Sequence, residues 1–505
     1  MRLLVDGLRY DQVDEPFVAD LEPYRHQART LALVREALAQ GETLCILNSS
    51  VTGSGKTLAN FAPAILDGVP TLGVYPTNEL IRDQEGTLLG RGGQRAYLAE
   101  EDVVRVDSAE LDRWQDLMQV RGHTEALQPI ISRWAGWEHK ALLTNPDILY
   151  LMVYDLYGYS YKVGYRERIF QALLNEYPII AFDEFHLYDT KQVGNVAFVV
   201  GTIARLASNK PHVFIFSSAT PQGVREWAKG RLGLRVEDVT FHPAPAGRPV
   251  CEPLELTLVP TDLSRWKGLE TILETVWPEM QRYVHDYERH EDDRLFPRGV
   301  FILDSVYAAK VLAARLAAEY GKGAVGEIHG YMDKANRACN LERRFSVGTT
   351  TIDVGVDLTG NKAKEFIVFE ARSGAQFVQR LGRLGRRGRE ADQITIPNRA
   401  WGLVPHYVRN CVADQLKTWE ADLTRRLPRA GVLGLVDVAY TPEEEFRRYW
   451  MVYSPLEAAA AKKRILSAYL SDRRDEAEER LRRVIGELYR GLALDVLTEK
   501  VTHIV

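Results

Sequence analysis

The sequence predicts an α/β protein with two lobes, each a parallel β-sheet flanked by helices. A chain of 505 residues is too long for a single hydrophobic core. Short apolar runs alternate with longer segments of helical periodicity, which is typical of parallel sheets. This alternation stops at a proline-rich segment, residues 236–253, and starts again beyond it. We therefore expect two such sheets in tandem, followed by a helical region.

The apolar runs locate the strands of each lobe. The first lobe, residues 1–235, contains "TLCILNSS", "TLGVYP", "YPIIAFDEF" and "HVFIFSSAT". The second lobe, residues 254–439, contains "LELTLVP", "RGVFILDS", "AVGEIHG", "RFSVGTTTIDVGVDL" and "EFIVFEARSG". Residues 236–253 are expected to link the lobes, because their prolines would interrupt a helix or a strand.

Residues 440–505 form a tail in which the strand pattern ends. Apolar residues recur there at helical spacing with dense charge between them. Such helices either pack back on the second lobe or present a surface to a partner. We favour packing on the second lobe, since charge on a helix is usually a solvated face.

The overall charge and the chain start exclude several classes of protein. A formal net charge of -5 argues against a protein that coats nucleic acid through bulk electrostatics, because such binders carry a basic excess. No run of about 18 apolar residues offers a membrane span. The start "MRLLVDGLRYDQVDEPF" lacks the apolar stretch of a secretory signal. We expect a cytoplasmic protein without membrane contact.

Residues 48–57, "NSSVTGSGKT", end like a phosphate-binding loop but carry Ser50 where the pattern G-x-x-x-x-G-K-[ST] has glycine. An apolar strand precedes this loop and a helical pattern follows it, which is the order that phosphate binding requires. Serine costs little if position 50 needs only a small residue. The alternative is a chance match in a long chain.

Each polar position of this loop has an expected role toward ATP and Mg²⁺. Gly53, Ser54 and Gly55 would bring backbone amides to the phosphates. Lys56 would reach the β- and γ-phosphates, and the Thr57 hydroxyl would ligate Mg²⁺.

The acidic partner of the loop is expected at the end of "YPIIAFDEFH". Asp183 would hold the metal, Glu184 would orient or activate water, and His186 follows. A surface acid pair would not normally follow so apolar a run, because that run should be buried.

The order of motifs over residues 20–390 resembles the superfamily 2 helicases of the DExH kind. "LEPYRHQ" is similar to their adenine-reading motif, with Gln27 as the reader. "YPTNELIRDQ" resembles motif Ia, "LLTNPDILYL" resembles the next strand-gripping motif, and "SSATP" resembles motif III. In the second lobe "GVFILDS", "VGTTTIDVGVDL" and "QRLGRLGRRG" resemble motifs IV, V and VI. The resemblance implies two RecA-like lobes and an ATP-dependent helicase.

The same resemblance assigns further residues to the nucleotide. Arg383 and Arg386 of motif VI would reach the γ-phosphate, and such guanidinium groups stabilise charge on the transferred phosphoryl group. Gln379 would lie near them, and Gly355 and Asp357 match positions close to the ribose and phosphates. The alternative for the arginines is a basic patch for nucleic acid. A separate set would couple hydrolysis to movement: His186, Ser218 and Thr220.

Residues in the strand-gripping motifs would contact a single nucleic-acid strand through its backbone. Backbone contacts carry little sequence information, and they would explain how an acidic chain binds nucleic acid. Each of these residues could equally be a loop or cap residue. They are Thr77, Thr144, Asn145, Ser305 and Thr349.

Among helicase families, "NSSVTGSGKT", "YPTNELIRDQ", "AFDEFHLYD" and "FSSATP" are most similar to the CRISPR-associated DExH helicase, specifically the stand-alone helicase subunit of type I-D systems. This implies unwinding of target DNA for a nuclease that belongs to the large subunit of the effector complex. The dipeptide His285-Asp286 lacks the further ligands of a fused HD nuclease, and we interpret it as solvated. An RNA helicase and a slowly hydrolysing nucleotide-gated clamp remain the alternatives to a DNA helicase.

Overall fold

The computed structural model forms two compact units, which we describe separately. The first lobe comprises Gln12–His242 and Pro442–Val505, and the second comprises Met1–Asp11 and Pro243–Thr441. The structure describes the chain apart from residues 16, 19–20, 51–53, 92–94, 134–137, 154–162, 208–209, 219–222, 241–246, 265, 288–295, 331, 333, 353–357, 387–395, 420–425, 441–448, 469–473 and 491–505.

The first lobe is a sheet of seven parallel strands. Their order across the sheet is β5-β6-β4-β7-β8-β3-β9. In chain order they are β3 (Leu44–Asn48), β4 (Thr71–Val74), β5 (Val103–Val106), β6 (Ala141–Thr144), β7 (Ile179–Phe182), β8 (Val213–Ser217) and β9 (Arg235–Val239). The four predicted strands of this lobe are confirmed as β3, β4, β7 and β8, which are neighbours in the sheet in the order β4-β7-β8-β3.

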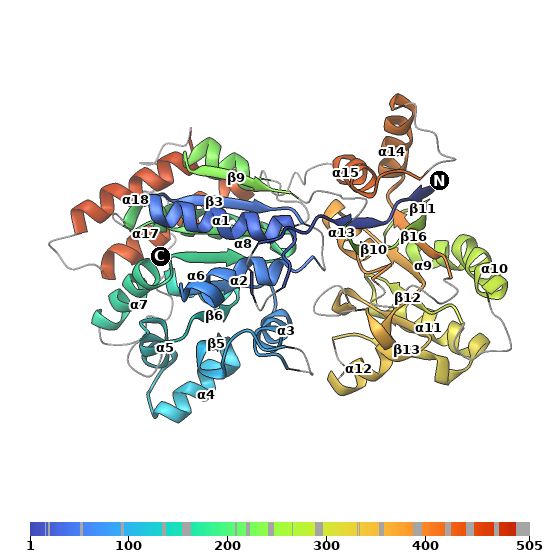
Figure 1. Ribbon diagram of the computed structural model, residues 1–505, viewed down its shortest axis with the longest axis horizontal. Coiled ribbons are helices and arrows are strands. Elements are labelled where there is room, and N and C mark those ends of the chain that lie inside the picture. Colours follow the sequence, from blue (N-terminus) through green and yellow to red (C-terminus); the bar gives the residue numbers. More distant parts are fainter. Residues whose placement is uncertain are drawn as a thin grey trace. The chain divides into compact units, whose positions relative to one another are not determined.

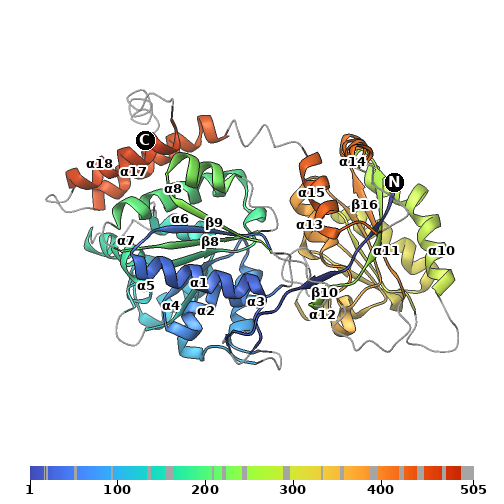
Figure 2. The ribbon, with the colours of Figure 1, turned by 45° about the horizontal axis from the view of Figure 1, so that its top comes forward.

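Helices cover both faces of this sheet (Figures 1 and 2). They are α1 (Arg25–Gln40), α2 (Lys56–Asp67), α3 (Asn78–Leu88), α4 (Ser108–Met118), α5 (His123–Ile131), α6 (Pro146–Val153), α7 (Val163–Glu176) and α8 (Thr190–Leu206). Strand residues alternate between two cores: Leu44 and Ile46 join one, and Cys45 and Leu47 join the other. Burial on both faces explains why these strands read as continuous apolar runs.

The C-terminal tail packs on the first lobe, so the prediction that it packs on the second was wrong. Its helices α17 (Ser454–Ala468) and α18 (Arg474–Leu488) lie against α8, as both ribbon views show. Leu481 and Val484 are fully buried in the larger core of this lobe. Gly201 of α8 allows the close approach, because a Cβ there would lie 2.8 Å from Val484.

Polar contacts fix the tail on the same surface. Arg205 of α8 donates to Glu487 at 2.9 Å, and Arg231 donates to the carbonyl of Leu488 at 2.8 Å. The hydroxyls of Ser454 and Tyr489, both buried, lie 2.6 Å apart. The tail helices are therefore an integral part of the first lobe, because their residues belong to its core.

The second lobe has a seven-stranded sheet in which one strand is antiparallel. The order is β1-β11-β16-β15-β12-β14-β13, and only β1 runs against its neighbour. The strands are β1 (Arg2–Val5), β11 (Leu254–Pro260), β12 (Gly299–Ile302), β13 (Val325–Ile328), β14 (Phe345–Gly348), β15 (Phe366–Glu370) and β16 (Asn398–Val404). All five predicted strand segments of this lobe contain one of these strands. The first residues of the chain, expected in the first lobe, instead form the edge of this sheet.

Helices also cover the second sheet. The lobe contains in addition a separate sheet of two strands. The helices are α9 (Lys267–Thr271), α10 (Trp277–Tyr287), α11 (Val306–Tyr320), α12 (Lys334–Glu342), α13 (Gly374–Leu381), α14 (His406–Thr418) and α15 (Arg429–Ala439). The pair consists of β2 (Leu8–Tyr10) and β10 (Arg248–Cys251), which run antiparallel.

The chain passes from one lobe to the other within the proline-rich segment 236–253, and this segment also contains strand residues. The chain leaves the first lobe after His242. Most of β9 and all of β10 lie within the segment, so the expectation that its prolines exclude regular structure was wrong. Pro249 sits inside β10, a two-stranded edge position where a missing amide is tolerated.

Among the helices that the structure describes, none is both long and apolar enough to cross a membrane.

Candidate nucleotide site

The predicted phosphate loop joins the end of β3 to the start of α2. Ser50 is fully buried, and its amide donates to the side chain of Asn48 at 3.1 Å. The non-glycine residues with positive φ in the described chain are Gln119, Arg133 and Glu184. Ser50 therefore adopts a backbone open to any residue, which explains how serine replaces glycine there.

Gly55 caps α2 in a conformation that requires glycine. Its φ is 75°, and a Cβ added to it would lie 2.5 Å from the amide nitrogen of Gln27. That nitrogen donates to the Gly55 carbonyl at 2.9 Å, while the Gln27 oxygen accepts from the Tyr24 amide at 2.9 Å. Gln27, the predicted adenine reader, thus ties α1 to the loop.

Lys56 lies buried beside the predicted acidic pair. Its ammonium group is 3.6 Å from a carboxylate oxygen of Glu184 and has no hydrogen-bond partner among the described residues. A buried ammonium without hydrogen bonds costs free energy unless a ligand satisfies it. A phosphate oxygen would do so.

Asp183 and Glu184 follow β7 directly and are both buried. Burial and the neighbouring Glu184 raise the pKa of Asp183 to about 7, against the opposing effect of Lys56. Glu184 adopts a left-handed conformation, with φ 45° and ψ 43°, which costs on the order of 1 kcal/mol for a non-glycine residue. Strain of this kind is concentrated at functional sites.

His186 and Ser218 connect the acidic pair to the end of β8. The Nδ1 atom of His186 lies 3.5 Å from Glu184 Oε2 and 3.5 Å from the Ser218 hydroxyl. The Ser218 amide donates to the carbonyl of Asn48, where the phosphate loop begins. Four sequence-predicted residues, Lys56, Glu184, His186 and Ser218, are thus brought together.

Two residues of this site were missed by the sequence analysis. Gln84 accepts from the Thr57 hydroxyl at 2.6 Å. It stands in the quoted segment "YPTNELIRDQ", whose polar end was the available signal. His26 is buried, and burial together with Lys56 lowers its pKa to about 4. Four predicted residues lie outside the described part of the chain: Gly53, Thr220, Gly355 and Asp357.

The hydroxyl, carboxylate and ammonium groups present fit ATP with Mg²⁺. Thr57 and Asp183 offer oxygen atoms, the donors that Mg²⁺ prefers. The buried cluster sets two carboxylates, Asp183 and Glu184, against the single ammonium group of Lys56. A divalent cation would offset the remaining negative charge.

The predicted motif VI residues lie on α13 and just after it, in the second lobe. Gln379 and Arg383 are buried, and Arg386 is half-buried against Gly382. Arg380 is fully buried and donates to Asp304 at 3.1 Å and to the carbonyl of Glu370. Burial of these arginines argues against a plain basic patch, although Arg387 and Arg389 lie outside the described residues.

The five residues predicted to grip nucleic acid all have partners within the protein. The Thr77 and Ser305 hydroxyls accept from Leu80 and Ala308 at 3.3 Å and cap α3 and α11. Asn145 accepts from Ile148 at 2.8 Å at the start of α6.

The other two of the five are buried. Thr144 has no exposed surface and donates to the carbonyl of Val106 at 2.8 Å. The Thr349 hydroxyl lies 3.5 Å from that of Thr351. Thr77, Asn145 and Ser305 therefore make the cap contacts named as the alternative, Thr349 stands in a loop and Thr144 ends strand β6. Their contact with nucleic acid stays a prediction.

His285 and Asp286 are exposed at the end of α10, as expected of a solvated dipeptide. In the described chain, no three His, Cys, Asp or Glu residues are arranged to hold a metal ion.

Comparison with known families identifies the first lobe. Residues 24–227 match the family described as DEAD/DEAH box helicase. These residues form a DEAD/DEAH-box helicase domain. The match spans the phosphate loop, the acidic pair and the end of β8, which are the groups that converge in the site. No curated protein sequence matches the chain.

Solved structures extend the similarity over both lobes. Cas3 from T. fusca with ATP is 15% identical over 97% of this chain, with a TM-score of 0.58. The DUF1998 helicase MrfA bound to DNA is 16% identical over 92%, with a TM-score of 0.57. The Mycobacterium smegmatis helicase Lhr, bound to ssDNA and AMP-PNP, is 19% identical over 94%, with a TM-score of 0.53.

These likenesses identify the fold of the whole chain as two tandem RecA-like lobes. The chain spans 59%, 56% and 55% of the lengths of Cas3, MrfA and Lhr respectively. The two-lobe fold of this chain therefore corresponds to one part of each of these larger proteins.

Proposed function

We propose that this protein is an ATP-dependent helicase that moves along single-stranded DNA. The observation that carries the proposal is the buried cluster of Lys56, Asp183 and Glu184, set at the start of α2 and the end of β7 within a helicase domain. The solved relatives support the ligands, since the MrfA structure holds DNA, the Lhr structure holds ssDNA and AMP-PNP, and the Cas3 structure holds ATP.

The proposed chemistry assigns each charged group one task. Lys56 binds the phosphates, and Glu184 accepts the proton of the water that attacks the γ-phosphate. Mg²⁺, when held by Thr57 and Asp183, supplies positive charge to the phosphates. Arg383 and Arg386 stabilise the charge that develops on the transferred group.

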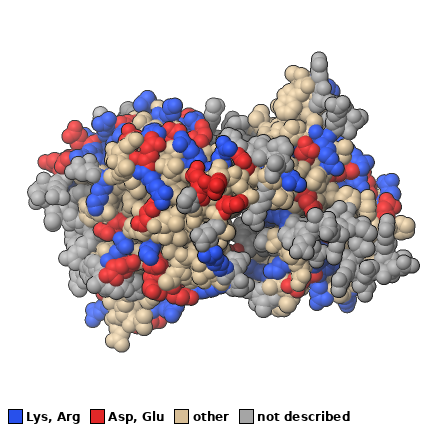
Figure 3. Space-filling model, in the orientation of Figure 1, with Lys and Arg blue, Asp and Glu red and all other residues tan. Residues whose placement is uncertain are grey.

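Binding of a strand through local contacts is consistent with the surface charge. The face drawn in Figure 3 shows Lys and Arg interspersed with Asp and Glu over each lobe, without a broad cationic area. A formal net charge of -5 agrees with local contacts to the nucleic-acid backbone.

Two substitutions separate nucleotide binding from hydrolysis. Lys56→Ala should abolish ATP turnover and weaken nucleotide binding, because no other described ammonium group replaces the one buried at the acidic pair. Glu184→Gln should keep nucleotide binding and lose hydrolysis, since the amide cannot accept the proton. Equilibrium binding of a fluorescent ATP analogue and phosphate release measure the two steps. Equal loss of nucleotide binding in both variants would contradict the assigned roles.

The nucleic acid is identified by strand displacement on matched DNA and RNA duplexes, together with ATPase rates in the presence of single-stranded DNA, single-stranded RNA or neither. Displacement and stimulation by DNA alone support the proposal. RNA stimulation would make the protein an RNA helicase, and nucleotide-dependent binding without displacement would make it a clamp.

We further propose that the helicase acts in CRISPR type I-D interference, where it unwinds target DNA for a separate nuclease subunit of the effector complex. The residues of the helicase motifs, which resemble those of CRISPR-associated helicases, and the structural similarity to Cas3 support this role. The purified chain, given ATP with Mg²⁺, Mn²⁺, Ni²⁺ or Co²⁺ on single-stranded and R-loop DNA, should unwind and not cut. Cleavage that persists in Lys56→Ala would contradict the proposal, as would a gene neighbourhood without CRISPR effector genes.

A further inference from the structure

An exposed pair of aromatic rings stands at the carboxyl end of the sheet in the second lobe. Trp266 follows β11, and Tyr307 lies in the first turn of α11. Trp266 is 46% exposed and Tyr307 60% exposed, yet their ring centroids are only 4.6 Å apart, with an interplanar angle of 65°. Single exposed aromatic residues are common, but two in contact form a contiguous apolar surface, which is typical of a binding site.

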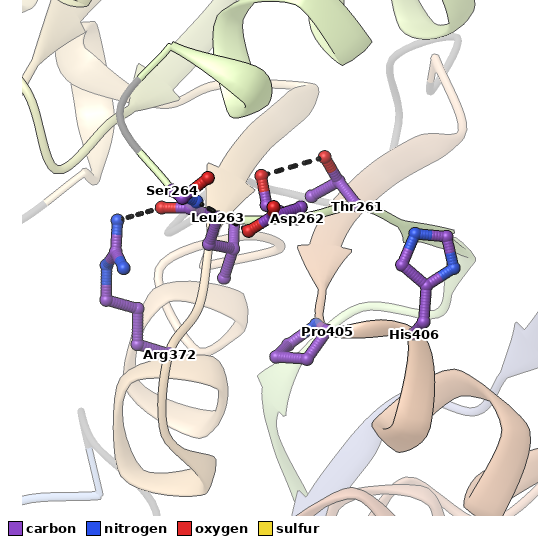
Figure 4. Close-up of a pocket in the computed structure, with 7 residues that line it drawn as sticks. All are labelled: Thr261, Asp262, Leu263, Ser264, Arg372, Pro405 and His406. Carbon is purple, nitrogen blue, oxygen red and sulfur yellow. Dashed lines mark hydrogen bonds between the residues drawn. The ribbon is translucent and has the colours of Figure 1, made fainter.

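Arg372 holds the two rings together by joining the loops that carry them. Its Nε atom donates to Asp304, three residues before Tyr307, at 2.5 Å. Its Nη2 atom donates to the carbonyl of Leu263, three residues before Trp266, as Figure 4 shows. The pair is therefore positioned before any ligand arrives, which lowers the entropic cost of binding.

The interior of the lobe supports the same arrangement from below. The buried Arg380 donates to the second oxygen of Asp304 at 3.1 Å. Glu370 accepts from the Asp304 amide at 2.7 Å. A Cβ at Gly268 would overlap the Glu370 carboxylate, so the start of α9 beside Trp266 is pressed against the end of β15. A glycine at 268 is required by this close approach.

The surroundings of the pair carry cationic, acidic and polar groups. Leu263, Ser264 and Arg372 line a pocket of about 470 Å³ (Figure 4), together with Thr261, Asp262, Pro405 and His406. Lys310, one turn beyond Tyr307 on α11, is exposed and has no ion-pair partner among the described residues. Aromatic rings near the exposed ammonium group of Lys310 suit a ligand that combines flat aromatic groups with negative charge.

We propose that Trp266 and Tyr307 form a stacking platform for an unpaired base of the nucleic-acid strand, with Lys310 meeting its phosphate. This proposal rests on the proposed function, because it assumes that the second lobe holds a single strand. It adds a contact with the bases to the backbone contacts expected of this protein. Stacking tolerates any base sequence, because every base has an aromatic face.

The test compares two single strands of equal length, oligothymidylate and a strand made only of abasic deoxyribose phosphates, at one fixed salt concentration. The full chain should bind the abasic strand roughly 5-fold to 100-fold more weakly, the range expected for loss of a stacked base. Trp266→Ala and Tyr307→Ala should weaken oligothymidylate binding by a similar factor and change abasic binding less than about twofold.

Conservative and remote variants make the comparison specific. Trp266→Phe keeps an aromatic face and should retain most of the affinity. Trp419→Ala removes an equally exposed tryptophan, 55% accessible, from the end of α14 in the same lobe and should bind both strands like the wild type. Thermal unfolding midpoints check that each variant is folded.

Each outcome has a defined meaning. A wild-type chain that binds both strands equally, or alanine variants that weaken both strands alike, would overturn the stacking platform alone. A wild-type chain that binds neither strand would contradict the proposed function itself.

Discussion

Gly55 is the residue at which backbone and side-chain constraints coincide. Its positive φ excludes most residues, and Gln27 fills the space where a Cβ would stand. The same loop must leave its amides open toward a phosphate group. A single methyl group at this position therefore disturbs both the helix start and the contact to α1.

Gly55→Ala should weaken ATP binding by at least about tenfold, because the methyl group displaces the Gln27 side chain and twists the loop. Gly68→Ala is the matched control: Gly68 ends the same helix with φ 64°, and nothing lies within 4 Å of its added Cβ. Both variants bear the backbone cost, and only the first bears the clash. Titration with a fluorescent ATP analogue measures the difference. Equal effects of the two substitutions would show that the contact with Gln27 is irrelevant.

Arg386→Ala should slow ATP hydrolysis by roughly 10³-fold or more if the guanidinium group stabilises the transferred phosphoryl group. Arg282→Ala, which removes an exposed arginine of α10 in the same lobe, should leave the rate unchanged. Steady-state phosphate release with saturating single-stranded DNA is the measurement. Normal turnover combined with weaker DNA binding in Arg386→Ala would restore the basic-patch interpretation.

The sequence predicts the charged centre of the site better than its supports. Lys56 and Glu184 are predicted because the chemistry fixes their residue types and their places at strand ends. Gln84 and His26 are not, because many residue types could support Thr57 or pack beside Lys56. Contacts of this second kind depend on tertiary proximity, which no local pattern records.

At the scale of elements, the sequence analysis missed two interior strands, β6 and β16, and three strands at sheet edges. β5, β9 and β1 each lie at the edge of a sheet. An edge strand buries less of its surface, so its residues need not form a continuous apolar run. β9, "RVEDV", shows this with one buried residue among five.

Helix caps bear on the predicted nucleic-acid contacts at the same scale. Thr77, Asn145 and Ser305 stand in loops before helices, where a hydroxyl or amide serves a cap as readily as a ligand. Sequence alone does not separate these uses, because both need a short polar side chain at the same place.

His212, the residue immediately before β8, should make the stability of the protein sensitive to acid. Burial lowers its pKa from 6.5 to about 4, so the unfolded state binds more protons below pH 6.5. The unfolding free energy should therefore fall as the pH falls from 6.5 to 4, by up to about 1.4 kcal/mol per pH unit. In His212→Gln this dependence should be smaller, and the exposed His285→Gln should behave like the wild type. Urea unfolding at a series of pH values measures the slopes, and identical slopes in His212→Gln and wild type would refute the prediction.

At the scale of the whole molecule, the two lobes are interleaved along the chain. The chain starts in the second lobe, enters the first at Gln12, returns at Pro243 and re-enters the first at Pro442. The apolar pattern of the tail predicts that its helices pack on something, but it does not specify the lobe. Only the three-dimensional fit of residues such as Val484 against Gly201 decides that, and this fit involves positions 283 residues apart.

The interleaving predicts that residues 12–242 do not form a stable lobe without the tail. Among the large tail residues buried in the first lobe's core are Trp450, Leu481, Val484 and Leu488. Burial of each contributes about 1.5–3 kcal/mol, so their sum approaches the whole stability of a typical domain. Residues 12–242 produced alone should therefore bind a hydrophobic dye and unfold without a cooperative transition. Co-production with residues 442–505 should restore a soluble complex with a cooperative transition, and a tail carrying Leu481→Asp should not. A fragment 12–242 that unfolds at the same temperature with and without the tail would show that α17 and α18 are dispensable for the lobe.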